Sequence, residues 1–170
     1  IGSRLVREIP SAFPGAELVM IDNLMTQRYA SLFNLPRDGA RRFMEGDILK
    51  TDLAPVFDGA DAVVHLAAIT DAANSFQIKD QVENVNLRGS LLVAEACAKA
   101  GCPMIFISTT SVYGSQSSLV DEDCPLSDLK PQSPYAESKL KAEQAIREMG
   151  RQGGFKAVIF RFGTIFGISP

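Results

Sequence analysis

The chain has 170 residues, of which 46% are hydrophobic and 22% are charged, a profile typical of one soluble globular domain. Its net charge of −3 provides no positive field for nucleic acid, and no apolar run approaches the roughly 20 residues that a membrane helix needs. The first residues lack a secretory signal, and three cysteines without a metal-ligand spacing indicate reduced thiols in a cytoplasmic protein that binds no metal.

Short apolar runs alternate with helical patterns along the chain. Each run is rich in Val, Ile, Leu, Met or Phe and is followed by polar or small residues, which predicts strands buried on both faces of a parallel sheet. The predicted strands are Glu17–Ile21, Arg42–Met44, Ala62–Leu66, Met104–Ser108 and Ala157–Phe160.

Two longer stretches predict helices. Residues 80–100 carry apolar side chains at near-helical spacing and end before Gly101, while residues 135–149 combine good helix formers with charges and end before Gly150. The β-α alternation predicts an α/β fold with right-handed crossovers and a doubly wound parallel sheet.

Both ends of the chain interrupt this pattern. The sequence opens without Met at Ile1-Gly2-Ser3 and stops at Pro170, directly after a predicted strand and a Gly-containing turn. We therefore expect residues 1–170 to form one domain that is cut short at both ends.

Ligands of doubly wound sheets bind outside the carboxyl ends of the strands. We therefore expect the residues that follow the predicted strands to line one edge of the molecule. They are Asp22, Asp47, Leu66-Ala67-Ala68, Ser108-Thr109-Thr110 and Arg161-Phe162-Gly163.

Tyr135 and Lys139 are four residues apart at the start of a predicted helix, so they share one face. A tyrosine base working near neutral pH needs its pKa lowered by roughly 3 units from about 10, and a neighbouring ammonium favours the phenolate. A solvated Tyr/Lys pair on the surface would have the same spacing. The hydroxyls after strand Met104–Ser108 could bond the same substrate oxygen, or could only satisfy a turn.

Asp22 ends a predicted strand 20 residues after Gly2. A carboxylate there would accept hydrogen bonds from both adenosine ribose hydroxyls and would repel a 2′-phosphate, which favours NAD over NADP. Asp22 could equally cap the next helix, and Asp47 has the same two interpretations. His65, the single histidine, is interpreted as a packed, hydrogen-bonded core residue.

Together these segments resemble the extended short-chain dehydrogenase/reductases, the NAD-dependent epimerase/dehydratase family of sugar nucleotides. The resemblance runs from Ile1 to Pro170 and implies a Rossmann domain whose first strand and C-terminal substrate lobe are missing. The matching segments are Ile1-Gly2-Ser3 (the end of a GxxGxxG turn), Asp22-Asn23-Leu24, Gly46-Asp47-Ile48, His65-Leu66-Ala67-Ala68, Val85–Ser90, Ser108–Gly114 and Ser133–Lys139.

The resemblance assigns roles to individual residues. Tyr135 would be the acid/base, Thr109 its hydrogen-bonding partner at the substrate, and Lys139 the ribose anchor that tunes the tyrosine. The implied NAD-binding residues are Gly2, Asp22, Asn23, Asp47, Ile48, Leu66, Ala67, Ala68, Asn86, Ser108, Tyr135, Lys139, Phe162 and Gly163.

Two departures from the family pattern refine the expected reaction. Family dehydratases carry Asp-Glu directly after the Thr, but this chain has Thr110 and Ser111, so epimerisation is favoured over dehydration. Thr164 stands where many members have an Asn that contacts the sugar nucleotide, which weakens the assignment to a UDP-hexose.

The leading hypothesis is therefore a nucleotide-sugar epimerase resembling UDP-glucose 4-epimerase, which acts on a UDP-hexose through a transient keto intermediate. The alternatives are an oxidoreductase of a sugar nucleotide or another secondary alcohol, a catalytically silent NAD-binding protein, and a chain that is inert as a fragment. The resemblance also implies a homodimer formed through helices 80–100 and 135–149.

Overall fold

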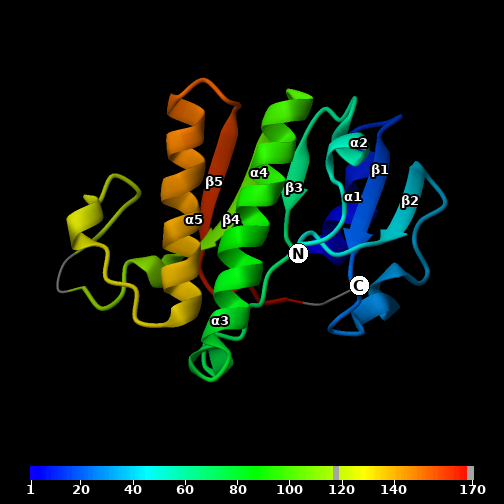
Figure 1. The fold of residues 1–170 in the computed structure, drawn as a ribbon. Coiled ribbons are helices and arrows are strands. Elements are labelled where there is room, and N and C mark those ends of the chain that lie inside the picture. The colour runs from blue at the N-terminus through cyan, green and yellow to red at the C-terminus, as the bar shows by residue number, and fades with distance from the viewer. Residues whose placement is uncertain (117–118, 168–170) are drawn as a thin grey trace. The chain divides into compact units, whose positions relative to one another are not determined.

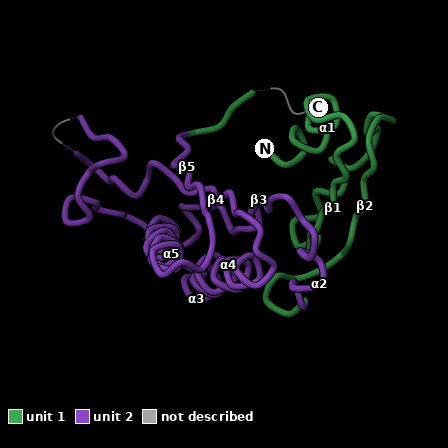
Figure 2. The backbone as a smooth tube through the Cα atoms, turned by 90° about the horizontal axis from the view of Figure 1, so that it is seen from above, with its two compact units in different colours: residues 1–51, 164–170 green, residues 52–163 purple. Residues whose placement is uncertain are grey.

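The computed structural model describes residues 1–116 and 119–167. The chain divides into two compact units, which Figure 2 distinguishes by colour: Ile1–Thr51 with Thr164–Pro170, and Asp52–Gly163. We call these unit 1 and unit 2. The expectation that residues 1–170 form one domain stays a prediction.

Unit 1 contains helix α1 (Gly2–Ala12) and two parallel strands, β1 (Glu17–Asp22) and β2 (Ala40–Glu45). The register pairs the last residues of both strands, Asp22 and Glu45. Arg41 joins β2 to the helix, because its Nε donates to the Val6 carbonyl at 2.8 Å. Arg7 donates in turn to the carbonyls of Ser31 and Phe33, so two guanidinium groups hold the loop between the strands against α1.

Unit 2 contains the larger sheet. Its strands are β3 (Val63–His65), β4 (Met104–Thr109) and β5 (Ala157–Phe162), which are parallel and ordered β3-β4-β5. Its helices are α2 (Ala54–Phe57), α3 (Lys79–Val82), α4 (Gly89–Ala100) and α5 (Pro134–Arg151), with a π-helical segment, Glu83–Arg88, between α3 and α4.

Helices α4 and α5 lie side by side on one face of this sheet (Figures 1 and 2). The strand residues facing them form the core, in which Met104 and Phe106 are fully buried together with Val93 and Ile146 of the helices. The alternation of β5 turns its other side chains to the opposite face. There Val158 and Phe160 are 52% and 44% exposed.

All five predicted strands are present, with ends that differ by one or two residues. Helix 135–149 is confirmed and extended at both ends, but residues 80–100 do not form one regular α-helix, because the π-helical turn interrupts it. Apolar spacing cannot distinguish the two windings over a single turn. Helices α1 and α2 were not predicted; α2 has only four residues, which is too short to show a helical period.

None of the helices in the part of the chain that the structure describes is both long and apolar enough to cross a membrane. The short 3-10 turns in this part are Arg28–Leu32, Asn74–Phe76, Thr110–Val112 and Leu126–Asp128.

The ends of the two long helices follow known capping rules. The Ser133 hydroxyl accepts a hydrogen bond from the Ala136 amide at 3.2 Å, and Pro134 occupies the first helical position of α5. Gly101 ends α4 with φ of 69°, a left-handed conformation that favours glycine.

Two glycine-to-alanine substitutions should therefore have opposite effects. Gly101→Ala should lower the free energy of unfolding by about 1 kcal/mol, because the Cβ of alanine is sterically disfavoured in the left-handed conformation. Gly150→Ala lies within α5 and meets only ordinary van der Waals contact, so it should leave stability unchanged or raise it by up to about 1 kcal/mol. Urea unfolding measures both, and equal effects would contradict the assigned cap.

Candidate active site

Thr109 and Tyr135 lie together at the carboxyl end of the sheet in unit 2. Thr109 is the last residue of β4 and is 7% exposed, while Tyr135 is half-buried in the first turn of α5. Burial raises the pKa of Tyr135 above its ordinary value, and a hydrogen bond with Thr109 lowers it in part. The structure thus brings together the two hydroxyls that the sequence pairs.

Lys139 is buried one helical turn after Tyr135. Its Nζ donates to the Ile107 carbonyl at 2.9 Å and lies 4.8 Å from the centroid of the Phe106 ring. Burial lowers the pKa of Lys139 to about 8, against the opposing effect of the Glu143 charge. The expected face shared by Tyr135 and Lys139 is confirmed by their positions on α5.

The lowered Tyr135 pKa that a phenolate base requires is not found in this structure. Loss of hydration disfavours the phenolate more than the Thr109 hydrogen bond favours it. The Lys139 ammonium is directed to the Ile107 carbonyl. In this arrangement the phenol of Tyr135 therefore keeps its proton near neutral pH, and a phenolate requires added positive charge near the phenol oxygen.

Asn86 lies in the π-helical segment and is fully buried. Its Oδ1 accepts from the Ile69 amide at 2.8 Å, and its Nδ2 donates to the Ile69 carbonyl at 2.9 Å. Nδ2 also lies 3.3 Å from the Ser138 hydroxyl, which donates to the Tyr135 carbonyl. Asn86 thereby ties the segment after β3 to the first turn of α5, so its side chain positions other groups.

His65 is a core residue, as predicted. Its ring is 4% exposed and packs against Phe106, and Nε2 lies 3.0 Å from the Ser90 hydroxyl. Because that hydroxyl donates to the Asn86 carbonyl, it accepts from His65 and Nε2 carries the proton. Burial first, and the Lys139 charge second, lower the pKa of His65 to about 3, so the imidazole is neutral.

A buried ion pair lies behind the tyrosine and lysine. The Glu143 carboxylate is 1% exposed and receives Nε and Nη2 of Arg161, with Nη2 at 2.7 Å, as well as the Ser108 hydroxyl. These hydrogen bonds raise the pKa of Arg161, whose guanidinium also lies over the Tyr113 ring. No role was predicted for Glu143 from the sequence, although it lies four residues after Lys139, just as Lys139 lies four residues after Tyr135.

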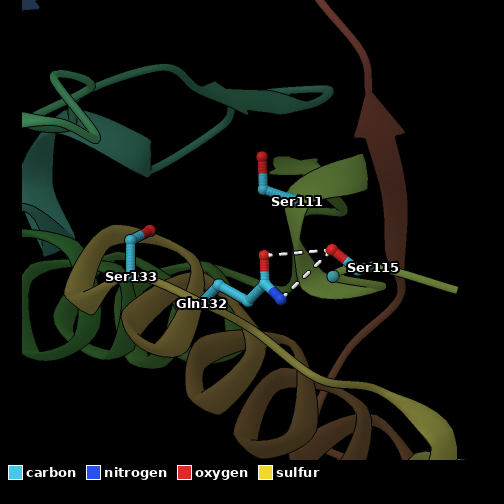
Figure 3. A pocket seen from close by; sticks show the side chains of 5 residues that line it. Ser111, Ser115, Gln132 and Ser133 are labelled. Atoms are coloured by element: carbon cyan, nitrogen blue, oxygen red, sulfur yellow. Dashed lines mark hydrogen bonds between the residues drawn. The ribbon is translucent and has the colours of Figure 1, made fainter.

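A polar pocket of about 300 Å³ opens beside the start of α5. Figure 3 shows that it is lined by hydroxyl and amide side chains, and Ser115 and Gln132 hydrogen-bond to each other across it. The Thr109 hydroxyl donates to the Ser111 hydroxyl at 3.1 Å. This hydrogen bond links the pocket to Thr109 and Tyr135. The lining residues are Ser111, Gly114, Ser115, Gln132 and Ser133.

The other site residues predicted in unit 2 also lie at the strand ends. Leu66, Ala67 and Ala68 follow β3 and are half-buried. The register places Phe162 beside Thr109, and a Cβ on Gly163 would lie 3.7 Å from the Thr110 hydroxyl. Ser108 is buried and engaged by Glu143, so its side chain faces the ion pair.

The site residues predicted in unit 1 lie at corresponding places in that unit. Gly2 is the first residue of α1, and Asp22 ends β1 with an exposed side chain whose Oδ1 accepts from the Leu24 amide at 2.7 Å. Asn23 and Asp47 form similar turns with the amides of Met25 and Leu49. Ile48 is half-buried in the turn after β2.

Among residues 1–116 and 119–167, no group of three or more His, Cys, Asp or Glu side chains is arranged to hold a metal ion. The candidate site thus consists of hydroxyls, one phenol, one ammonium and a buried ion pair. Such a set suits proton transfer to and from an alcohol oxygen.

Comparison with known proteins identifies the family of the chain. The NAD dependent epimerase/dehydratase family matches residues 1–169, and the chain belongs to it. The resemblance inferred from the sequence is thereby confirmed.

Individual relatives carry more specific descriptions. A UDP-glucose 4-epimerase of Azospirillum brasilense is 32% identical over 176 residues, covering 100% of this chain and 47% of the relative. A trifunctional UDP-glucose 4,6-dehydratase/UDP-4-keto-6-deoxy-D-glucose 3,5-epimerase/UDP-4-keto-L-rhamnose-reductase of Arabidopsis thaliana is 28% identical, covering 98% of this chain and 26% of the relative. The chain thus spans about half of the first and a quarter of the second.

Solved structures confirm the fold. The UDP-glucuronic acid 4-epimerase of Bacillus cereus, in complex with UDP-glucuronic acid and NAD, matches with a TM-score of 0.85 and 31% identity. The match covers 99% of this chain and 55% of that protein. The α/β fold with parallel sheets and flanking helices is therefore of the Rossmann type, as predicted.

The bonds of Asn86 predict a large difference between two identical substitutions. Asn86→Asp should lower the free energy of unfolding by about 3 kcal/mol or more, since it buries a carboxylate against the Ile69 carbonyl. Asn84→Asp makes the same change at an exposed position and should alter it by less than about 0.5 kcal/mol. Denaturant unfolding measures both changes. An Asn86→Asp variant as stable as the wild type would contradict a structural role for the hydrogen bonds between Asn86 and Ile69.

The low pKa of His65 predicts a pH-dependent stability. Between about 6.5 and about 3 the unfolded chain binds a proton that the folded chain does not, so this residue reduces stability as the pH falls through that window. His65→Gln cannot take up that proton, so it should lose less stability between pH 6.5 and 4 than the wild type. Urea unfolding at several pH values checks this, and parallel curves would contradict it.

Proposed function

We propose that the protein is an NAD-dependent nucleotide-sugar epimerase that inverts carbon 4 of a UDP-hexose. The single observation that carries this proposal is the arrangement of Thr109, Tyr135 and Lys139 at one strand end in a chain of the epimerase/dehydratase family. The phenol and the Thr109 hydroxyl can both reach one alcohol oxygen, which is the requirement for oxidising a secondary alcohol.

The groups of unit 1 fit the adenosine and pyrophosphate of NAD. Helix α1 has 11 residues, and its N-terminus has no side-chain cap and no acidic residue in the first turn, which suits phosphate oxygens. The exposed Asp22 carboxylate suits ribose hydroxyls. A Cβ on Gly46 would lie 3.0 Å from the Thr51 hydroxyl, so the turn before Asp47 has no room for a larger side chain.

In the proposed mechanism Tyr135 transfers a proton and Thr109 orients the sugar. Tyr135 takes the proton of the sugar 4-hydroxyl, while Thr109 holds the same oxygen by a hydrogen bond. NAD, when bound, supplies the chemistry of accepting a hydride and returning it to the opposite face of the keto sugar. Tyr135 then gives its proton back to the inverted hydroxyl, so no proton is lost to water.

In this mechanism the phenolate of Tyr135 needs the positive charge of Lys139. Burial holds the Tyr135 pKa above its ordinary value, so the phenolate forms only if positive charge stabilises it. Lys139 lies one helical turn after Tyr135 on α5, and with a pKa of about 8 it carries a positive charge at neutral pH.

The residues after Thr109 support epimerisation rather than dehydration. The family's dehydratases use an Asp-Glu pair for water elimination, and here Thr110 and Ser111 provide only hydroxyls. The pocket lining adds two further serines and an amide. The hydroxyls of Ser and Thr and the amide of Gln can hydrogen-bond a sugar but do not serve as general acids near neutral pH.

UDP-glucuronic acid is a second candidate substrate. The similar Bacillus cereus protein is described as a UDP-glucuronic acid 4-epimerase, and the match covers 99% of this chain. The same reaction at carbon 4 would apply, since the two substrates differ only at carbon 6. A homodimer through residues 80–100 and 135–149 stays a prediction; α4 and α5, which overlap these stretches, lie side by side on one face of the sheet (Figure 1).

The first test is an assay of the full-length protein with NAD and either UDP-galactose or UDP-glucuronic acid. We expect the 4-epimer of one substrate to form without net NADH. Tyr135→Phe should lower kcat at least about 100-fold, because it removes the acid/base, whereas Tyr29→Phe makes the same change at an exposed site and should match the wild type. Stoichiometric NADH would instead identify an oxidoreductase, and no product from either sugar would contradict the proposal.

A further inference from the structure

Glu143 lies on the face of α5 that carries the candidate acid/base. It is one helical turn after Lys139 and two turns after Tyr135, and residues at this spacing share one side of a helix. Its side chain is 1% exposed. Burying a carboxylate to this degree destabilises the fold unless its oxygens are hydrogen-bonded or paired with positive charge.

The contacts of Glu143 reach the two strands that end at the site. On β4 its partner is the hydroxyl of Ser108, which directly precedes Thr109. On β5 its partner is Arg161, with Nε at 3.1 Å and Nη2 at 2.7 Å from the carboxylate. Within α5, Nη2 of Arg147 lies 3.9 Å from the same carboxylate. The carboxylate therefore fixes the ends of β4 and β5 to α5.

The same carboxylate is the acidic group that acts on Lys139. The ammonium also meets the Ile107 carbonyl and the Phe106 ring, and the His65 imidazole beyond that ring is neutral. Burial favours loss of the Lys139 proton, and the charge of Glu143 opposes that loss. Arg161 is paired with Glu143 through two nitrogens, which fixes the position of the carboxylate.

We propose that Glu143 is a positioning residue for the reaction: its carboxylate, anchored by Ser108 and Arg161, holds Thr109 in place and supplies a buried negative charge one helical turn from Lys139. The consequence for turnover rests on the proposed function, whereas the effect on Lys139 does not. Glu143 touches neither of the reacting hydroxyls, so it acts through its neighbours.

The test is the titration of Lys139 in the full-length protein, followed by NMR of lysine labelled with ¹³C at Cε and assigned with Lys139→Arg. Glu143→Gln keeps the shape and removes the charge, and it should lower the Lys139 midpoint by about one pH unit. The upper limb of the kcat–pH profile should move by the same amount. Glu148→Gln removes the same charge from an exposed position on α5 and should move neither.

An unchanged midpoint in folded Glu143→Gln would overturn the proposal. If the unpaired Arg161 prevents folding, the double variant Glu143→Gln/Arg161→Gln removes that lone charge and should still show a downward shift, which is smaller because loss of the guanidinium charge favours the Lys139 ammonium. A wild type that converts no UDP-sugar, combined with a shifted midpoint, would contradict the proposed function and support this inference. Turnover of a UDP-sugar combined with an unchanged Lys139 midpoint would support the proposed function and contradict this inference.

Discussion

The buried carboxylate of Glu143 is the constraint on which the geometry of the candidate site depends. Removing a carboxylate from water costs several kcal/mol unless charge and hydrogen bonds replace the lost hydration. Ser108 and Arg161 provide both, and they can do so only when β4, β5 and α5 meet in one arrangement. This arrangement positions Thr109, which directly follows Ser108, and Tyr135, which lies two helical turns before Glu143 on α5.

A second polar contact sets the neighbouring side of the site. Asn86 satisfies both backbone groups of Ile69 and reaches Ser138, so the segment after β3 and the first turn of α5 move together. Apolar contacts tolerate small shifts, whereas paired hydrogen bonds in a buried place do not. Two polar clamps therefore give unit 2 a defined geometry that its apolar core alone would not specify.

Burial also changes the acid–base character of these side chains. It raises the pKa of Tyr135, lowers that of Lys139 to about 8 and lowers that of His65 to about 3. In each case the dominant cause is the loss of hydration by the charged form. At neutral pH burial therefore keeps Tyr135 and His65 uncharged, whereas Lys139 retains its proton and Glu143 is paired with Arg161.

The sequence by itself determined the strands, helix 135–149, the pairing of Tyr135 with Lys139 and the strand-end location of Thr109. Apolar runs and helical spacing are local, and they survive in any fold that buries them. Only the tertiary structure decided the π-helical turn at Asn86, the burial of Glu143 and the direction of the Tyr135 pKa. A glutamate among the charges of a helix resembles a solvated residue, and only the packing of β4 and β5 against α5 removes water from it.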